Sequence, residues 1–169
     1  MMQTDVKTAH LNGTGQVMVG RTRLKQLMYL GTGTAGGVIF FDTTTAPVTT
    51  ATYARSGTTV TITQTAHGYS VGQSIGIDFA AGTGGTATDG NYAIATVPTA
   101  DTYTITDINS GSITAGAACV LSPGGWLAAY DTSTAIQPFQ VLLPGEGIVA
   151  KNGIYVYCTN INFTSIAYG

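Results

Sequence analysis

The sequence is poor in charged residues. Of its 169 residues only 8% are Asp, Glu, Lys or Arg, against about 25% in typical soluble domains, and the formal net charge is −2. Six basic residues give no patch of the kind that captures phosphate groups, so we expect no binding to nucleic acid or to an anionic membrane. Most of the surface must therefore consist of neutral side chains.

Features that would indicate metal sites, export or membrane insertion are also scarce. The two histidines and two cysteines lack the spacing of a zinc site, and we expect no metal and no cofactor. For Cys119 and Cys158 we expect buried thiols, with a disulfide as the alternative. Residues 1–7 contain no apolar stretch, and no run approaches the roughly 18 apolar residues of a membrane span. We therefore expect neither a cleavable export signal nor a membrane segment.

Glycine, threonine and alternating apolar residues take the place of charge. The chain has 23 glycines, and its threonine-rich composition disfavours helix and favours strands joined by tight turns. In the middle of the chain, apolar side chains occupy every second position, which predicts half-buried strands. The predicted strands are residues 58–64, 74–79, 91–97, 102–106 and 117–121. Strands at this spacing predict a small antiparallel barrel or sandwich.

The two ends of the chain also read as β-structure. Short segments rich in β-branched or aromatic residues predict strands at 16–19, 38–41, 139–143, 154–158 and 161–168. Residues 21–30 have two interpretations, because Leu24, Leu27 and Met28 have helical spacing. We prefer a strand, since the segment lacks an N-cap and lies between other strands.

Two changes in composition divide the chain. They occur at Ala46-Pro47 and at Ser122-Pro123-Gly124-Gly125, where turn-forming residues gather. We predict an all-β protein in which residues 1–47 and 124–169 form a discontinuous, jelly-roll-like sandwich. Residues 48–123 are predicted to form an inserted small antiparallel β-barrel or sandwich domain.

Several segments resemble known proteins. In the outer domain they are Val6-Lys7-Thr8-Ala9, Gly20-Arg21-Thr22-Arg23-Leu24-Lys25 and Leu143-Pro144-Gly145-Glu146-Gly147-Ile148. In these segments the chain resembles small virion proteins of tailed bacteriophages. The insert resembles a β-module that recurs in phage structural proteins, through Val60-Thr61-Ile62-Thr63 and Ala66-His67-Gly68-Tyr69-Ser70-Val71-Gly72. The resemblance implies a structural protein of the capsid, the head-to-tail junction or the tail.

The function that we expect is non-enzymatic. The main hypothesis is a capsid decoration or cement protein that bridges neighbouring subunits of the major capsid protein or other virion proteins, as a homotrimer. Its location would be the virion, assembled in the cytoplasm of the host bacterium. One alternative is a tail or fibre module that binds a host glycan, with the insert as the reader. A weaker alternative is a glycan-cleaving enzyme that uses aspartates of the insert.

No group of residues predicts a catalytic centre. Residues 31–36 match G-x-G-x-x-G, but a strand rather than a helix follows, which favours a hairpin loop over a nucleotide site. The insert aspartates could approach one another to bind calcium or act as acid and base, but turn-forming roles are the simpler interpretation. These aspartates are Asp78, Asp89, Asp101 and Asp107.

One basic cluster is a candidate partner contact. Arg21, Arg23 and Lys25 alternate along the chain, so on a strand all three side chains would point to the same side. They could contact an acidic partner protein or form a solvated strand face. Glu146 lies in a Pro-Gly-Glu-Gly turn, and Trp126 is expected to pack near the second border.

Overall fold

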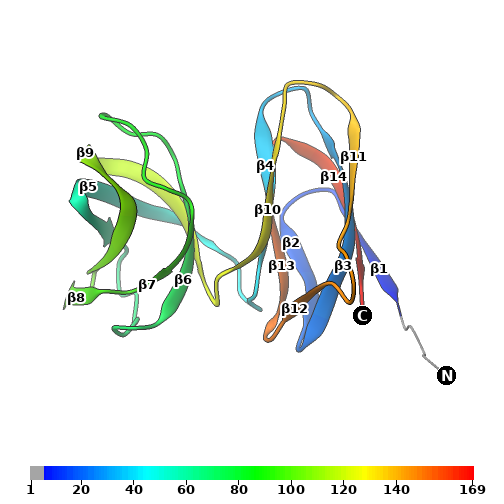
Figure 1. Ribbon diagram of the computed structural model, residues 1–169, viewed down its shortest axis with the longest axis horizontal. Helices are drawn as coiled ribbons and strands as arrows, with labels where there is room; N and C mark the ends of the chain where they lie inside the picture. Colours follow the sequence, from blue (N-terminus) through cyan, green and yellow to red (C-terminus); the bar gives the residue numbers. More distant parts are fainter. Residues whose placement is uncertain (1–5) are drawn as a thin grey trace. The chain divides into compact units, whose positions relative to one another are not determined.

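A computed structural model describes residues 6–169 of the chain. The described residues form fourteen strands and no helix, so the all-β prediction is confirmed. These residues therefore contain no helix that could cross a membrane. The chain divides into two compact units (Figure 1): residues up to Ala46 together with Trp126–Gly169, and Pro47–Gly125. The borders expected from sequence were after residue 47 and after residue 123.

The first unit consists of two antiparallel sheets that face each other (Figure 1). One has the order β1-β14-β3-β11, with β12 also paired to β3, and the other has the order β10-β4-β13-β2. The strands are β1 (Lys7–Leu11), β2 (Gly15–Val19), β3 (Thr22–Gly31), β4 (Gly36–Phe41), β10 (Trp126–Thr132), β11 (Pro138–Leu142), β12 (Ile148–Ala150), β13 (Gly153–Thr159) and β14 (Ile161–Tyr168).

This strand order is that of a jelly roll. Successive strands alternate between the two sheets, with β11 and β12 acting as one interrupted strand. The exception is the pair β4 and β10, which are neighbours in the same sheet, with Phe41 opposite Trp126. The second unit is inserted between these two strands. An insertion here leaves and returns at adjacent points, which keeps the sandwich intact.

The core of the first unit explains why residues 21–30 looked partly helical. Leu24, Leu27 and Tyr29 of β3 are all buried between the sheets, so the strand prediction is confirmed. The register between β3 and β14 shifts where Gln26 pairs with Ala167 and Leu24 pairs with Tyr168. This bulge adds one residue, so Leu24 and Leu27 face the same core although they are three positions apart.

The second unit is built on one antiparallel sheet. Its order is β5-β9-β6-β7, with β8 on β9, and the sheet does not close into a barrel. The strands are β5 (Val48–Thr63), β6 (Ser74–Phe79), β7 (Gly90–Ala93), β8 (Thr96–Thr99) and β9 (Thr102–Pro123). Its own core includes Tyr53, Val60, Ile62, Tyr103 and Leu121, so each unit has a separate apolar interior.

Two strand predictions for the insert were wrong. Residues 102–106 and 117–121 are not separate strands, because β9 continues through the residues between them, with Gly111 paired to Gly57 of β5. Three register shifts between β5 and β9 let this long ribbon bend without breaking. Residues 91–97 are not one strand, because Ile94 bonds to Gln73 and Ala95 bonds to Thr104, which divides β7 from β8.

Candidate functional site

On the outer face of the sheet β1-β14-β3-β11, the part of β3 from Gln26 to Leu30 and the β11 and β14 residues beside it carry no charge. The register places Met28 between Gln140 and Ser165, and it places Leu30 between Pro138 and Phe163. We name this surface the neutral face. It consists of Gln26, Met28, Leu30, Pro138, Gln140, Leu142, Phe163, Ser165 and Ala167, all of them partly or fully exposed. A charge-free surface with apolar side chains is typical of the centre of a protein interface.

Exposed apolar side chains are concentrated at the β11 edge of this sheet. Leu142 is 73% exposed, Ile136 is 65% exposed and Phe139 is 50% exposed. These three lie within seven residues of the chain, whereas the other four large exposed apolar side chains are scattered. Leu142 belongs to the neutral face, whereas Phe139 pairs with the buried Tyr29 and lines a pocket that also includes Asp131.

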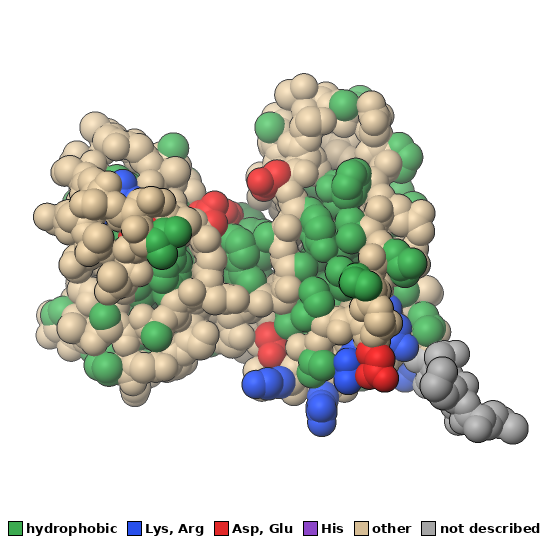
Figure 2. Space-filling view, in the orientation of Figure 1, with side chains coloured by type: hydrophobic (Ala, Val, Ile, Leu, Met, Phe, Trp, Pro, Cys, Tyr) green, Lys and Arg blue, Asp and Glu red, His purple; other side chains and the backbone are tan. Residues whose placement is uncertain are grey.

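The basic residues of the first unit gather at one end of the jelly roll (Figure 2). Lys7 of β1 lies opposite Tyr168 of β14, which lies opposite Leu24 of β3. The Gly20 N–H, next to Arg21, donates a hydrogen bond to the carbonyl of Asn152, next to Lys151. This basic end contains Lys7, Arg21, Arg23, Lys25 and Lys151. Five cations at one end leave the neutral face free of charge.

The predicted contact residues lie at this basic end. Arg23 and Lys25 lie on the more exposed side of β3, alternating with buried Thr22 and Leu24, and exposed Arg21 immediately precedes the strand. The Arg23 guanidinium forms an ion pair with the Glu146 carboxylate at 3.0 Å, and the Glu146 side chain is 81% exposed. Sequence spacing did not reveal this pair, because it joins residues far apart in the chain. Contact of the three cations with a partner stays a prediction.

Asp42 fixes the turn that carries Lys151. Its carboxylate accepts hydrogen bonds from the backbone N–H groups of Lys151 at 3.0 Å, Asn152 at 2.7 Å and Gly153 at 3.3 Å. Asp42 is buried, and these donors satisfy its charge. One sequence signal could have indicated this role: an aspartate directly follows the apolar strand β4. The basic end is therefore held in place by backbone contacts.

The four aspartates of the insert do not form one site. Asp89 accepts a hydrogen bond from the Phe79 N–H at 2.7 Å, and Asp101 accepts one from the Ala66 N–H at 2.7 Å. Asp107 pairs with Arg55, and Asp78 lies on β6. Among residues 6–169, no three His, Cys, Asp or Glu side chains are grouped so that they could hold a metal ion. Asp101 lies in the turn between β8 and β9, as the turn-forming interpretation expects, whereas the Asp89 bond joins it to Phe79, ten residues away.

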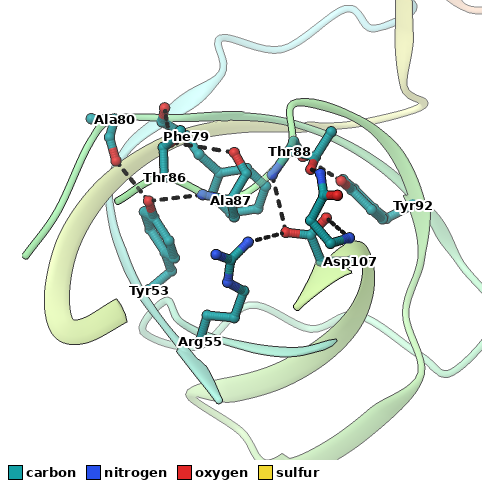
Figure 3. Close-up of polar contacts among 10 residues, drawn as sticks. Tyr53, Arg55, Phe79, Ala80, Thr86, Ala87, Thr88, Tyr92 and Asp107 are labelled. Atoms are coloured by element: carbon teal, nitrogen blue, oxygen red, sulfur yellow. Dashed lines mark hydrogen bonds and ion pairs between the residues drawn. The ribbon is translucent and has the colours of Figure 1, made fainter. Parts of the chain in front are cut away.

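Asp107 is the centre of a buried polar cluster (Figure 3). Its carboxylate bonds to the Arg55 guanidinium at 2.8 Å and accepts from the N–H groups of Thr88 and Asn109 at 3.1 Å each. Burial alone would raise the pKa of the Asp107 carboxyl, but the hydrogen bonds from Thr88, Asn109 and Arg55 outweigh it and lower that pKa. Both oxygens of the buried Asp107 carboxylate therefore have hydrogen-bond partners.

Two tyrosines extend this cluster along the segment between β6 and β7 (Figure 3). The Tyr53 hydroxyl donates to the Ala80 carbonyl at 2.7 Å and accepts from the Ala87 N–H at 3.4 Å, while the Tyr92 hydroxyl donates to the Thr88 carbonyl. Burial, with smaller contributions from Asp107 and Asp89, raises the pKa of Tyr92 to about 12. The cluster thus fastens a long connection to the sheet.

The glycine-rich segment after β3 is a connection between sheets. Residues 31–36 join β3 of one sheet to β4 of the other, so the hairpin expected from sequence was wrong. Gly33 has φ of +91°, and a Cβ on Gly36 would collide with the Thr159 carbonyl oxygen. The structure therefore favours glycine at both positions. Gly33 has a left-handed backbone that other residues rarely adopt, and Gly36 has no room for a side chain.

The histidines and cysteines take part in packing. His67 is buried against Tyr103 and accepts a hydrogen bond from the Tyr69 N–H at 3.0 Å, and the positive φ angles of its turn belong to Ala66 and Gly68. Both cysteines are free and belong to different units; Cys119 is buried, as expected, whereas Cys158 is only partly buried. Burial raises the pKa of Cys119 to about 12, which removes its reactivity near neutral pH.

The likeness of this chain to known proteins was compared in three ways. No protein-family model, no curated protein and no solved structure matches it. The function must therefore be argued from the jelly roll, the neutral face and the basic end.

Proposed function

We propose that this chain is a non-enzymatic structural protein of a tailed-bacteriophage virion. In this role it decorates the capsid and stabilises the shell by bridging neighbouring subunits of the major capsid protein. A protein that binds only the assembled shell stabilises that shell by its binding free energy, so catalysis is not needed. The jelly-roll unit supports this proposal, because capsid proteins are among the proteins that use this architecture.

The observation that carries the proposal is the neutral face. Nine side chains of three neighbouring strands form a surface without one charge, and the five cations of the unit gather at its one end, beyond Gln26 along β3. Interfaces between proteins have cores that are depleted of charged residues. The neutral face would form the centre of the contact, and Arg21, Arg23 and Lys25 would contact acidic groups at its rim.

Co-sedimentation with undecorated capsids tests this proposal. We expect Ser165→Glu to abolish co-sedimentation, because it places an unpaired charge in the middle of the neutral face. The control is Thr59→Glu, at an exposed position on β5 of the insert, which should bind as the wild type does. Equal binding of both variants, or no binding of the wild type, would contradict the proposal.

Copy number separates a capsid role from a tail role. A cement protein should be present in purified virions in numbers comparable to the capsid protein, whereas a tail part should be present in a few copies. Densitometry of stained gels measures this ratio. A ratio of a few copies per particle would favour the second candidate.

The second candidate is a glycan-binding module of a tail or fibre, and one pocket favours it. The pocket has a volume of about 320 Å³, which is in the range of small-ligand sites. Its lining residues include Tyr29, Phe139, Asp131 and Gln137. The buried Thr132 hydroxyl also lines it and has no hydrogen-bond partner. Rings beside polar groups could hold a sugar through stacking and hydrogen bonds.

Nuclear magnetic resonance titration with a panel of neutral hexoses tests this second candidate. Binding should shift the ring signals of Tyr29 and Phe139, and Gly31→Val should abolish the shifts, because a side chain there would approach Thr132 in the pocket. A panel that shifts neither ring in the wild-type protein would remove the candidate.

A further inference from the structure

Strand β11 forms an open edge of the first unit. It pairs with β3 on one side only. The N–H of Leu143, the next residue, donates to the Lys25 carbonyl of β3 at 2.9 Å. Because backbone groups alternate in direction along a strand, the N–H and C=O groups of Gln140 and Leu142 point the other way. The sheet therefore ends in a row of backbone groups that a further strand could bond.

Of the other edge strands of the jelly roll, β1, β2 and β10 carry protection against such pairing, and β12 has only three residues. Edge strand β1 begins with Lys7 and contains His10. Edge strand β2 has a register shift, and its Gln16 amide donates to the carbonyls of Met18 and Ile154. Edge strand β10 has a register shift and an exposed Asp131. Charges and bulges of this kind are the features by which natural proteins block edge-to-edge association.

Strand β11 carries no charge and no bulge, and its one protective residue is Pro138 at its start. Its pairing with β3 runs through five residues without a register shift, and no charged residue occurs between positions 132 and 145. Its apolar side chains are exposed instead of covered, with Leu142 at 73% and Phe139 at 50%. An uncharged, regular and apolar edge favours pairing with another strand.

We propose that β11 pairs antiparallel with β11 of a second copy of this chain. The N–H groups of Gln140 and Leu142 would donate to outward carbonyls of the partner strand, and the sheets of the two copies would become one. A two-fold contact needs only one surface that complements itself, and two neutral strands meet without charge repulsion. Pro138 and Pro144 have no N–H to donate, so the new ladder is short.

The partner strand is β11 and not another edge of the jelly roll. Head-to-tail pairing, which would generate a trimer or a filament, requires a second open edge, and β1, β2 and β10 are each protected. The pairing proposed here therefore closes at two copies, unlike the homotrimer expected from the phage resemblance. It does not depend on the proposed virion function, because it concerns the purified protein alone.

Sedimentation equilibrium of the purified full-length chain tests this pairing. We expect a concentration-dependent dimer, and we expect Leu142→Lys to raise its dissociation constant at least about tenfold, because two lysines would approach each other across the two-fold axis. The matched control is Val19→Lys, which adds the same charge at a residue 64% exposed on edge strand β2. This control should dimerise as the wild type does. Thermal unfolding verifies that both variants are folded.

Amide hydrogen exchange gives a second measurement that does not depend on a mutation. The Gln140 and Leu142 amides should become protected as protein concentration rises, because only a partner strand can bond them. A monomer at all concentrations up to about 100 µM, well above a micromolar dissociation constant, would overturn the proposal. A trimer, equal effects of the two lysine variants, or amides that exchange freely within a dimer would overturn it as well.

Discussion

At the scale of single residues, Asp107 carries the largest expected effect on stability. It is 2% exposed and faces Arg55, which is 8% exposed, so the pair is almost completely removed from water. We expect Asp107→Asn to lower the free energy of unfolding of the insert by about 3–5 kcal/mol, because the Arg55 charge would remain buried without a counter-charge. Urea unfolding followed by tyrosine fluorescence measures the change. A loss below about 1 kcal/mol, typical of an exposed pair, would contradict it.

The lowered pKa of Asp107 also predicts how stability depends on pH. A carboxyl whose pKa is lower in the folded than in the unfolded state stabilises the fold fully above the unfolded value of about 3.9. This contribution is lost as the pH falls through the lower, folded pKa. We therefore expect the insert of the wild-type protein to lose more stability on acidification below about pH 4 than the Asp107→Asn variant does. Parallel curves for the two proteins would contradict this prediction.

Gly36 provides a second test at this scale. A methyl group there would meet the Thr159 carbonyl, which belongs to the backbone and cannot turn away. We expect Gly36→Ala to destabilise the first unit by about 1–3 kcal/mol through overpacking. Gly13→Ala is the control, because a Cβ at Gly13 would have no heavy atom within 4 Å and the residue is not among those with positive φ. Thermal unfolding of both variants compares them, and equal melting temperatures would contradict the assignment.

At the scale of elements, the start of β3 supplies the charge that we expect to guide attachment. We predict that Arg21→Ala/Arg23→Ala weakens capsid binding at low salt and that the difference shrinks at high salt, because the Debye length falls from about 10 Å at 0.1 M to about 3 Å at 1 M. Co-sedimentation at several salt concentrations measures this.

The ion pair at the same position offers a test in the opposite direction. Glu146 offsets the charge of Arg23 at 3.0 Å, so Glu146→Gln should strengthen binding to an acidic surface at low salt. If the double mutant, this variant and the wild type bind alike at every salt concentration, the basic end is a solvated face.

At the scale of the whole molecule, the insertion point predicts that the first unit folds alone. Phe41 and Trp126 are paired residues of neighbouring strands, so the chain ends left by removing residues 47–125 lie close together. A short loop closes such a gap at little cost in entropy. We expect a variant with a Gly/Ser linker in place of residues 47–125 to keep a β-type circular dichroism spectrum and a cooperative unfolding transition. A wholly unfolded variant would contradict this prediction.

The sequence by itself determined the β-class of the protein and the position of most strands. Alternation of apolar and polar residues is a local property, and it identified β6 and part of β5. Content of β-branched and aromatic residues identified β2, β4, β11, β13 and β14, whereas β1, β10 and β12 were not predicted. Turn residues with low strand propensity marked the two places where composition changes. The alternation itself does not give the order of the strands in the jelly roll, since a periodic pattern does not say which strands are neighbours.

Only the tertiary structure decided how these strands pair and what their surfaces offer. The continuity of β9 depends on Gly57 of β5, which lies opposite Gly111, and the buried ion pair joins Arg55 to Asp107, 52 positions apart. The same holds for the neutral face, whose residues come from β3, β11 and β14. Strand patterns report the contacts of a residue with its own segment, whereas hydrogen-bonded partners, ion pairs and open edges depend on segments that only folding brings together.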